Sequence, residues 1–175
     1  MLSDNDRIQK LLQDKGCSVT KIKEQPYPTP DFKVQVEKQE FFCEVKSIHG
    51  DEWEEGERSD PTFNNIANKI HEAVKQFRSV NPDRELPNVL VLCNHRDECD
   101  SLDLEAVLTG LFHADDGTKH KIYGQYSDGK IKEEKLEIDL YVWLTKKNIA
   151  IGRFTTEKGK EIIIKAFGVP NQREI

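Results

Sequence analysis

Three residues in the first third of the chain have the types and spacing that phosphodiester chemistry requires. Pro30-Asp31 is followed, after twelve intervening residues, by Glu44-Val45-Lys46. Residues two apart in an extended strand share a face, so Glu44 and Lys46 point to one side and Val45 to the other. Two carboxylates brought together repel each other unless a cation lies between them, and hard oxygen ligands suit Mg²⁺. The pattern predicts a Mg²⁺ or Mn²⁺ site formed by Asp31, Glu44 and the Val45 carbonyl.

The chemistry expected of such a site is hydrolysis of a phosphodiester bond. A metal held there would polarise the phosphodiester and acidify a bound water molecule. Lys46 would orient that water, help to deprotonate it, or neutralise the charge that develops on phosphorus. The expected activity is that of a metal-dependent phosphodiesterase.

The elements around these residues must bring them together. Alternating apolar residues predict a hairpin with strands over 32–36 and 41–48 and a turn at 37–40. Before it, the sequence predicts a helix capped by Ser3 and ended by Gly16, and a strand over 17–22. After it come an amphipathic helix over 64–80 and an apolar strand over 89–93, which suits the interior of a parallel sheet.

The second half of the chain predicts one further helix and then strands. The helix is expected over 102–113, and strands over 121–126, 130–138, 140–144, 149–154 and 161–167, the last two paired across a turn at Lys158-Gly159. We therefore expect an α/β (mixed α+β) fold with a central mixed β-sheet flanked by helices and an antiparallel C-terminal strand region. One domain over 1–175 is expected, with its core at 3–95 and a strand-rich part at 117–175.

Pro30-Asp31 with Glu44-Val45-Lys46, on a predicted hairpin followed by a helix and an apolar strand, resembles the PD-(D/E)XK nuclease superfamily, which includes restriction endonucleases. The resemblance covers residues 3–95 and implies a restriction endonuclease-like fold. It implies that Asp31 and Glu44 bind Mg²⁺ and that Lys46 assists the attacking water. The function that follows is a Mg²⁺-dependent endonuclease, with DNA as the expected substrate.

Two further positions follow from the same resemblance. Many members place an amide or a basic side chain on the helix after the motif, which implies a catalytic role for Gln76, with Lys69 as the next choice. Members often have a Glu on the first helix at the metal site, and this chain has none there. Asp6 or Asp14 would have to replace it, although helix capping and solvent exposure explain both residues.

The charge distribution leaves two classes of partner open. The chain has a net charge of −6, but residues 117–175 hold 12 Lys and Arg against 8 Asp and Glu. This basic part either contacts nucleic-acid phosphates or is a solvated face.

The segment 51–60 holds six carboxylates, which would repel a polyanion. The alternative is a catalytically inactive protein-interaction or regulatory module on the same scaffold, with a protein partner at 51–60. Whether the active unit is a homodimer stays open.

Other features point to a cytoplasmic protein without a membrane segment. No apolar run exceeds five residues, whereas a membrane-spanning helix needs about 20. The four cysteines contain no Cys-x-x-Cys pair and are expected to be reduced core thiols. Cys93, His95 and Cys99 lack a clear fourth ligand for zinc. His49, just past the motif strand, is a further candidate for contact with the site.

Overall fold

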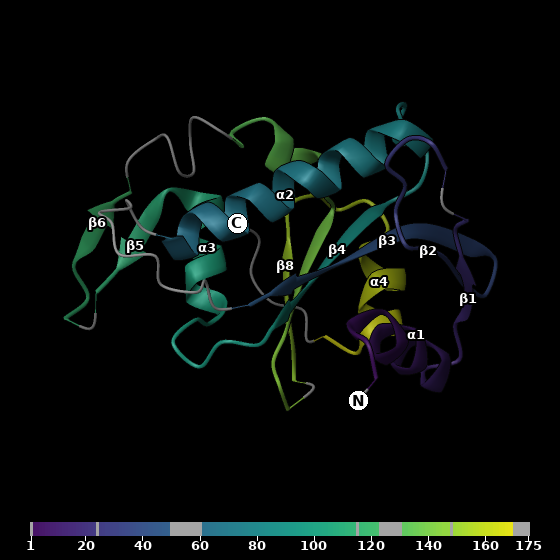
Figure 1. Cartoon of the computed structure of the whole chain (residues 1–175), viewed down its shortest axis with the longest axis horizontal. Helices are drawn as coiled ribbons and strands as arrows, with labels where there is room; N and C mark the ends of the chain where they lie inside the picture. Colours follow the sequence, from purple (N-terminus) through teal and green to yellow (C-terminus); the bar gives the residue numbers. More distant parts are fainter. Residues whose placement is uncertain are drawn as a thin grey trace.

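The chain folds around a six-stranded sheet, which the computed structural model describes together with the helices that cover it (Figure 1). The described residues are 2–23, 25–49, 61–114, 116–122, 131–147 and 149–169. In chain order the elements are α1 (Asp4–Asp14), β1 (Ser18–Lys21), β2 (Phe32–Val36), β3 (Gln39–Ile48), α2 (Pro61–Val80), β4 (Asn88–Asn94), α3 (Ser101–Thr109), β5 (Leu111–His113), β6 (Lys119–Lys121), the 3₁₀ helix η1 (Glu134–Glu137), β7 (Leu140–Leu144), β8 (Ala150–Phe154) and α4 (Lys160–Phe167).

The large sheet is mixed, with parallel strands at its centre. Its strand order is β1-β2-β3-β4-β7-β8, in which β3, β4 and β7 are parallel and the outer strands pair antiparallel. Every residue of β4 is buried, as expected for a strand covered on both faces. β5 and β6 form a separate two-stranded ribbon at one end of the molecule (Figure 1). The predicted central mixed sheet flanked by helices is confirmed.

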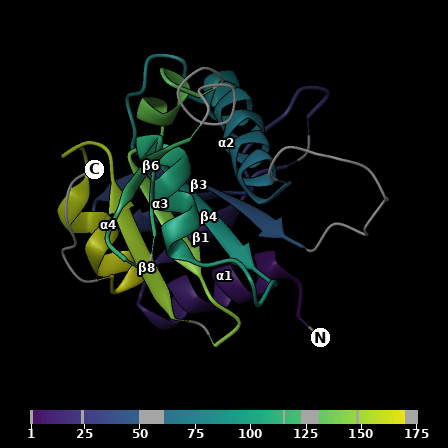
Figure 2. The same cartoon turned by 90° about the vertical axis from the view of Figure 1, so that its left-hand side faces the viewer.

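Helices cover both faces of the sheet, and each face has its own apolar core. α1 and α4 pack against one face, where their buried side chains join alternate residues of β2, β3 and β4. α2 and α3 cover the other face. Figure 2, turned from the first view, shows α2 on one side of the sheet and α1 on the other. Residues that alternate along β3 therefore face different helices, with Val45 on the α1 side and Ile48 on the α2 side.

Local sequence signals place the first elements correctly. The Ser3 hydroxyl accepts a hydrogen bond from the Asp6 amide in a capping box, and α1 starts at the next residue. The hairpin forms with Val36 paired to Gln39, so its turn is shorter than the predicted 37–40 and consists of Glu37 and Lys38. Glu37 takes a positive φ of 56°, which this tight turn requires. α2 ends where predicted and begins three residues earlier.

The predictions for the C-terminal part need three corrections. The helix predicted over 102–113 ends at Thr109, because Gly110 adopts the left-handed conformation and 111–113 becomes strand β5. The strand predicted over 130–138 is a turn and the 3₁₀ helix η1 across its described residues. The strand predicted over 161–167 is helix α4, so β8 pairs with β7 alone. Ile163, Ala166 and Phe167 lie at helical spacing on the core, and this packing overrides the strand preference of three successive isoleucines. Of the strand predicted over 121–126, residues 123–126 lie outside the described part of the chain.

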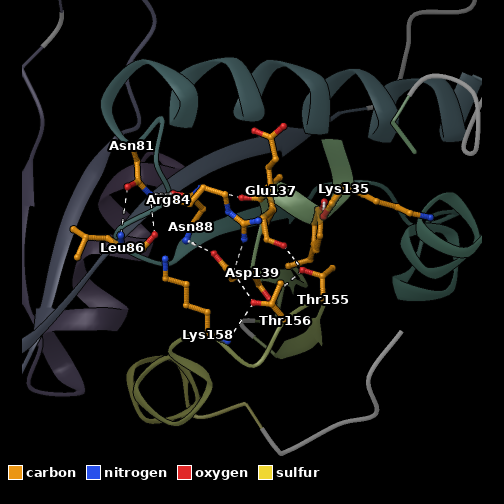
Figure 3. Close-up of polar contacts among 12 residues, drawn as sticks. Asn81, Arg84, Leu86, Asn88, Lys135, Glu137, Asp139, Thr155, Thr156 and Lys158 are labelled. Carbon is orange, nitrogen blue, oxygen red and sulfur yellow. Dashed lines mark hydrogen bonds and ion pairs between the residues drawn. The ribbon is translucent and has the colours of Figure 1, made fainter. Parts of the chain in front are cut away.

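A buried polar network ties together the amino ends of β4 and β7 (Figure 3). Asp139, which is completely buried just before β7, accepts hydrogen bonds from the Asn88 amide and the Arg84 guanidinium, each at 2.8 Å, and from the Thr156 hydroxyl. Asn88 is held in turn by the side chain of Asn81. Every oxygen of this carboxylate has a donor, so the network fixes the two strand ends against the segment before α4.

The remaining expectations concern membranes and thiols. None of the helices that the structure describes has the length and apolarity to span a membrane. All four cysteines are buried and free. Cys93 packs on the α1 side of the sheet and Cys99 in the α2 and α3 core, and the described residues hold no cluster of three or more metal-ligating side chains, so Cys93, His95 and Cys99 form no zinc site.

Candidate functional site

The hairpin register brings Asp31 beside Glu44. Phe32 pairs with Cys43, so Asp31, just before β2, lies next to the segment of β3 that runs past the end of its partner strand. The Asp31 backbone amide donates to Glu44 Oε2 at 3.0 Å, and the Val45 amide donates to Asp31 Oδ2 at 2.9 Å. Each carboxylate thus accepts a hydrogen bond from a backbone amide at or next to the other acid. The two carboxylates are held near one another without a direct hydrogen bond between them.

Lys46 completes the group from the same face of β3. Its ammonium Nζ lies 2.9 Å from Glu44 Oε1 and 3.5 Å from Glu72 Oε2 on α2. The Glu44 side chain is 2% exposed, whereas that of Lys46 is 18% exposed and that of Glu72 is 50% exposed. The group therefore runs from a buried acid through an ammonium to an acid at the surface.

The environment of Glu44 favours its neutral form. Burial raises its pKa most, the charge of Asp31 raises it further, and the ion pair with Lys46 opposes both, so that the pKa is about 8 instead of 4.5. The single ammonium of Lys46 does not outweigh burial and the second carboxylate. The Glu44 carboxyl group therefore holds its proton at neutral pH.

The first helix contributes Asn5 to this group. Asn5 Nδ2 donates to Asp31 Oδ1 at 2.7 Å. Asp6 is occupied by the capping box, and Asp14 is an exposed residue at the end of α1, so neither substitutes for the first-helix acid. An amide stands beside Asp31, and sequence reasoning missed it because α1 meets the hairpin only through tertiary packing.

Gln76 reaches the site from α2, as predicted. Its amide group lies against Glu44, and its Nε2 donates to the Thr29 carbonyl at 2.9 Å. Its Oε1 is buried and has no hydrogen-bond partner among the described residues. Lys69, the second candidate on this helix, has its Nζ 3.7 Å from Glu72 Oε2, the same oxygen that lies 3.5 Å from Lys46 Nζ.

A second polar cluster, formed by Asp4, Arg7, Ser47 and His95, adjoins the first through consecutive residues of α1. Asp4 Oδ2 accepts from the Ser47 hydroxyl and lies 2.7 Å from His95 Nε2, and its Oδ1 lies 2.7 Å from Arg7. Burial acts to raise the Asp4 pKa, but these hydrogen bonds and the charge of His95 outweigh it and hold the pKa below its ordinary value. His49 stacks on His95, with ring centroids 4.7 Å apart. His49 therefore belongs to this cluster, at the carboxyl ends of β3 and β4.

The donor set of the site determines which cations it suits. Asp31 and Glu44 supply four carboxylate oxygens, and each of them accepts at least one hydrogen bond or ion pair. A carboxylate oxygen has two lone pairs, so an oxygen that accepts a single bond retains one for a metal. Across the described ranges no three His, Cys, Asp or Glu side chains gather as a cation cage. A metal held by these two carboxylates alone would need further ligands from water or phosphate, as Mg²⁺ accepts.

Comparisons with known proteins give a limited likeness. No family model matches the chain, and no curated protein matches it. Among solved structures, that of Pyrococcus furiosus SfsA in complex with Ca²⁺ is similar at a TM-score of 0.36 and 19% sequence identity, over 86% of this chain. The chain spans 59% of the length of that structure. The function proposed below rests on the geometry of Asp31, Glu44 and Lys46.

Proposed function

We propose that this protein is a Mg²⁺-dependent nuclease that hydrolyses phosphodiester bonds in DNA, as its resemblance to the PD-(D/E)XK superfamily implies. The observation that supports the proposal is a buried Glu44 held between Asp31 and the ammonium of Lys46. A buried acid with a raised pKa beside a second acid and a lysine is an arrangement expected of a functional site rather than of a packing role. Mn²⁺ would serve in place of Mg²⁺ because it has the same preference for oxygen ligands.

The residues present fit such a metal. Asp31 and Glu44 repel each other, which contributes to the raised pKa of Glu44, and a divalent cation between them would relieve that repulsion. The Val45 carbonyl, on the strand between Glu44 and Lys46, is the third ligand proposed. Bound Mg²⁺ would polarise the phosphodiester and lower the pKa of a water molecule.

The side chains of the chain have separate tasks in this reaction. Asp31 and Glu44 provide negative charge at a fixed position, and Asn5 keeps Asp31 oriented through its hydrogen bond. The ammonium of Lys46 would donate hydrogen bonds to the attacking water or to the phosphoryl oxygens, where negative charge develops as the water oxygen bonds to phosphorus and the P–O bond to the leaving oxygen breaks. The attacking water would lose its proton to solvent, and the leaving oxygen would take a proton from solvent. Gln76 holds the Glu44 carboxylate in place from α2 and thereby limits its rotation.

The alternative is an inactive interaction module on the same scaffold. The acidic segment 51–60, which favours that alternative, lies outside the described residues. We expect the protein to act in the cytoplasm, where its free cysteines would stay reduced. A homodimer and a protein partner at 51–60 stay open as predictions.

A cleavage assay tests the proposal. Plasmid DNA and single-stranded DNA are incubated with the protein and with Mg²⁺, Mn²⁺ or EDTA, and products are followed on gels. We expect cleavage that requires the metal and that Lys46→Ala and Asp31→Asn each reduce by about 10²- to 10⁴-fold. The matched control is Lys33→Ala, which breaks an exposed ion pair with Glu40 on the same hairpin.

Two results would decide against the nuclease. One is a wild-type protein that cleaves neither substrate with either metal. The other is cleavage that persists in both site variants, which would indicate a contaminating enzyme. Thermal melting of each variant shows whether it remains folded.

A further inference from the structure

A cavity of about 490 Å³ opens directly beside the proposed active site. Its volume falls within the range of about 300–1,000 Å³ typical of sites that bind small molecules. Asn5, Asp31 and Gln76, three residues of the site already described, form one part of its wall. The rest of the wall comes from Lys21 at the end of β1 and from the segment between β1 and β2, including Gln25, Tyr27 and Thr29. The cavity therefore continues the site rather than forming a separate one.

The part of the wall that precedes Asp31 is held in a fixed shape. Pro26, Pro28 and Pro30 alternate along it, and each proline ring restricts the backbone. The Ser79 hydroxyl on α2 donates to the Pro28 carbonyl, and Gln76 donates to the next carbonyl, that of Thr29. Two consecutive backbone carbonyls are thus anchored to α2. A wall fixed in this way is organised before a ligand arrives.

The side chains of this wall have a particular chemistry. Tyr27 lines the cavity and is 51% exposed, so its ring is accessible to a ligand. Lys21 supplies a positive charge, and Gln25 and Gln76 supply amide groups that both donate and accept. A flat ring with adjacent amides and one cation matches a nucleobase and its phosphate, because bases stack on aromatic side chains and present mixed donor and acceptor edges.

We infer that this cavity binds one unpaired nucleobase of the nucleic acid whose phosphodiester lies at Asp31 and Glu44, with Tyr27 as the stacking surface. The inference rests on the proposed function, and it names the substrate class as DNA with a single-stranded segment next to the scissile bond. A base inside a duplex is stacked and paired, so it reaches such a cavity only by leaving the helix.

Binding without a metal tests the inference separately from cleavage. Fluorescein-labelled oligothymidylate of about 15 nucleotides, close to the longest site size of one binding fold, and a duplex of equal length are titrated with the wild-type protein in EDTA. We expect tighter binding to the single strand. Tyr27→Ala should weaken that binding by about 5- to 100-fold, and Tyr27→Phe should retain it, because stacking needs the ring and not the hydroxyl. Leu102→Ala, at an apolar residue of similar exposure on α3, is the control.

A second measurement tests whether the bound base lies against residue 27. In Tyr27→Trp, the fluorescence of the new indole should be quenched by oligothymidylate and not by the duplex. Equal affinity for both probes, or unchanged affinity and no quenching in the Tyr27 variants, overturns the inference. Binding that depends on Tyr27, without any cleavage in Mg²⁺ or Mn²⁺, supports the base-binding cavity and contradicts the proposed nuclease activity. Cleavage of a continuous duplex that Tyr27→Ala leaves unchanged supports the proposed nuclease activity and contradicts base binding in the cavity.

Discussion

Among the described residues two acidic side chains are buried, Glu44 in β3 and Asp139 before β7, and their surroundings differ. Asp139 lies at the amino ends of the parallel strands, where a backbone amide, a guanidinium and a hydroxyl all donate to it. Glu44 lies in the middle of β3, and its neighbours are the Asp31 backbone amide, the Gln76 side chain, one ammonium and a second carboxylate.

The difference indicates which buried acid is structural and which is functional. A fully bonded carboxylate between strands contributes to the folded state, and removing it leaves unpaired donors behind. A buried carboxylate beside another one contributes little to stability or reduces it, because its charged form is disfavoured there. The two acids should therefore respond to substitution in opposite ways.

Glu44→Gln is expected to give the largest effect, and on activity alone. The amide has the shape of the carboxyl group but cannot neutralise a metal, so metal-dependent cleavage should fall by about 10³-fold. The free energy of unfolding at neutral pH should stay within about 1 kcal/mol of wild type or rise, since a disfavoured charge is removed. DNA cleavage and urea denaturation measure the two quantities. Glu40→Gln, at an exposed acid of the same strand, should change neither of them.

Asp139→Ala should show the reverse behaviour. It leaves the Arg84 guanidinium and the Asn88 amide without their acceptor, and the free energy of unfolding should fall by about 3–5 kcal/mol. Cleavage per folded molecule should remain at the wild-type level. Glu137→Gln, which breaks a surface ion pair with Arg78, should cost less than about 1 kcal/mol in the same urea experiment. A stable Asp139→Ala protein without activity would contradict the contrast between the two acids.

Asn5→Ala should have an intermediate effect. Asn5 touches Asp31 and not the reacting atoms, so we expect cleavage to fall by about 10- to 100-fold, as for residues that orient a metal ligand. The Mg²⁺ concentration for half-maximal cleavage should rise, which a purely structural role would not cause. Lys10→Ala, at an exposed position of the same helix, serves as the control.

The pH dependence of stability should give the smallest change for each step of the experiment, at most about 1.4 kcal/mol per pH unit. Because the Glu44 pKa is about 8 when folded and 4.5 ordinarily, the folded state binds one proton more than the unfolded state between these values. The free energy of unfolding should therefore fall as pH rises from about 4.5 to about 8, by at most about 1.4 kcal/mol per pH unit from this group, and then level off. Urea denaturation across this range should show a shallower slope for Glu44→Gln. Equal slopes in the two proteins would mean that Glu44 titrates normally.

Local signals in the sequence predict the proposed site better than they predict the C-terminal part. Asp31, Glu44 and Lys46 belong to one hairpin, whose alternation and short turn determine their relation, and their convergence is predictable from strand geometry. The positions of Asn5 and of the second polar cluster around Asp4 are not predictable from the sequence, because α1 contacts β3 only in the folded chain. The isoleucines of α4 are ambiguous in sequence, since β-branched residues favour strands, and only the spacing of Ile163, Ala166 and Phe167 indicates the helix.

The pairing of Val36 with Gln39 constrains how the hairpin can change in length. Successive side chains of β3 enter different cores, so one residue inserted between the turn and Glu44 would exchange the environments of Cys43 and Glu44. Cys43 and Val45 would then face α2, and Glu44 and Lys46 would both enter the apolar layer beneath α1. Two inserted residues would return each side chain of β3 to its original face of the sheet. Natural or engineered variants of this hairpin should therefore differ in length by even numbers.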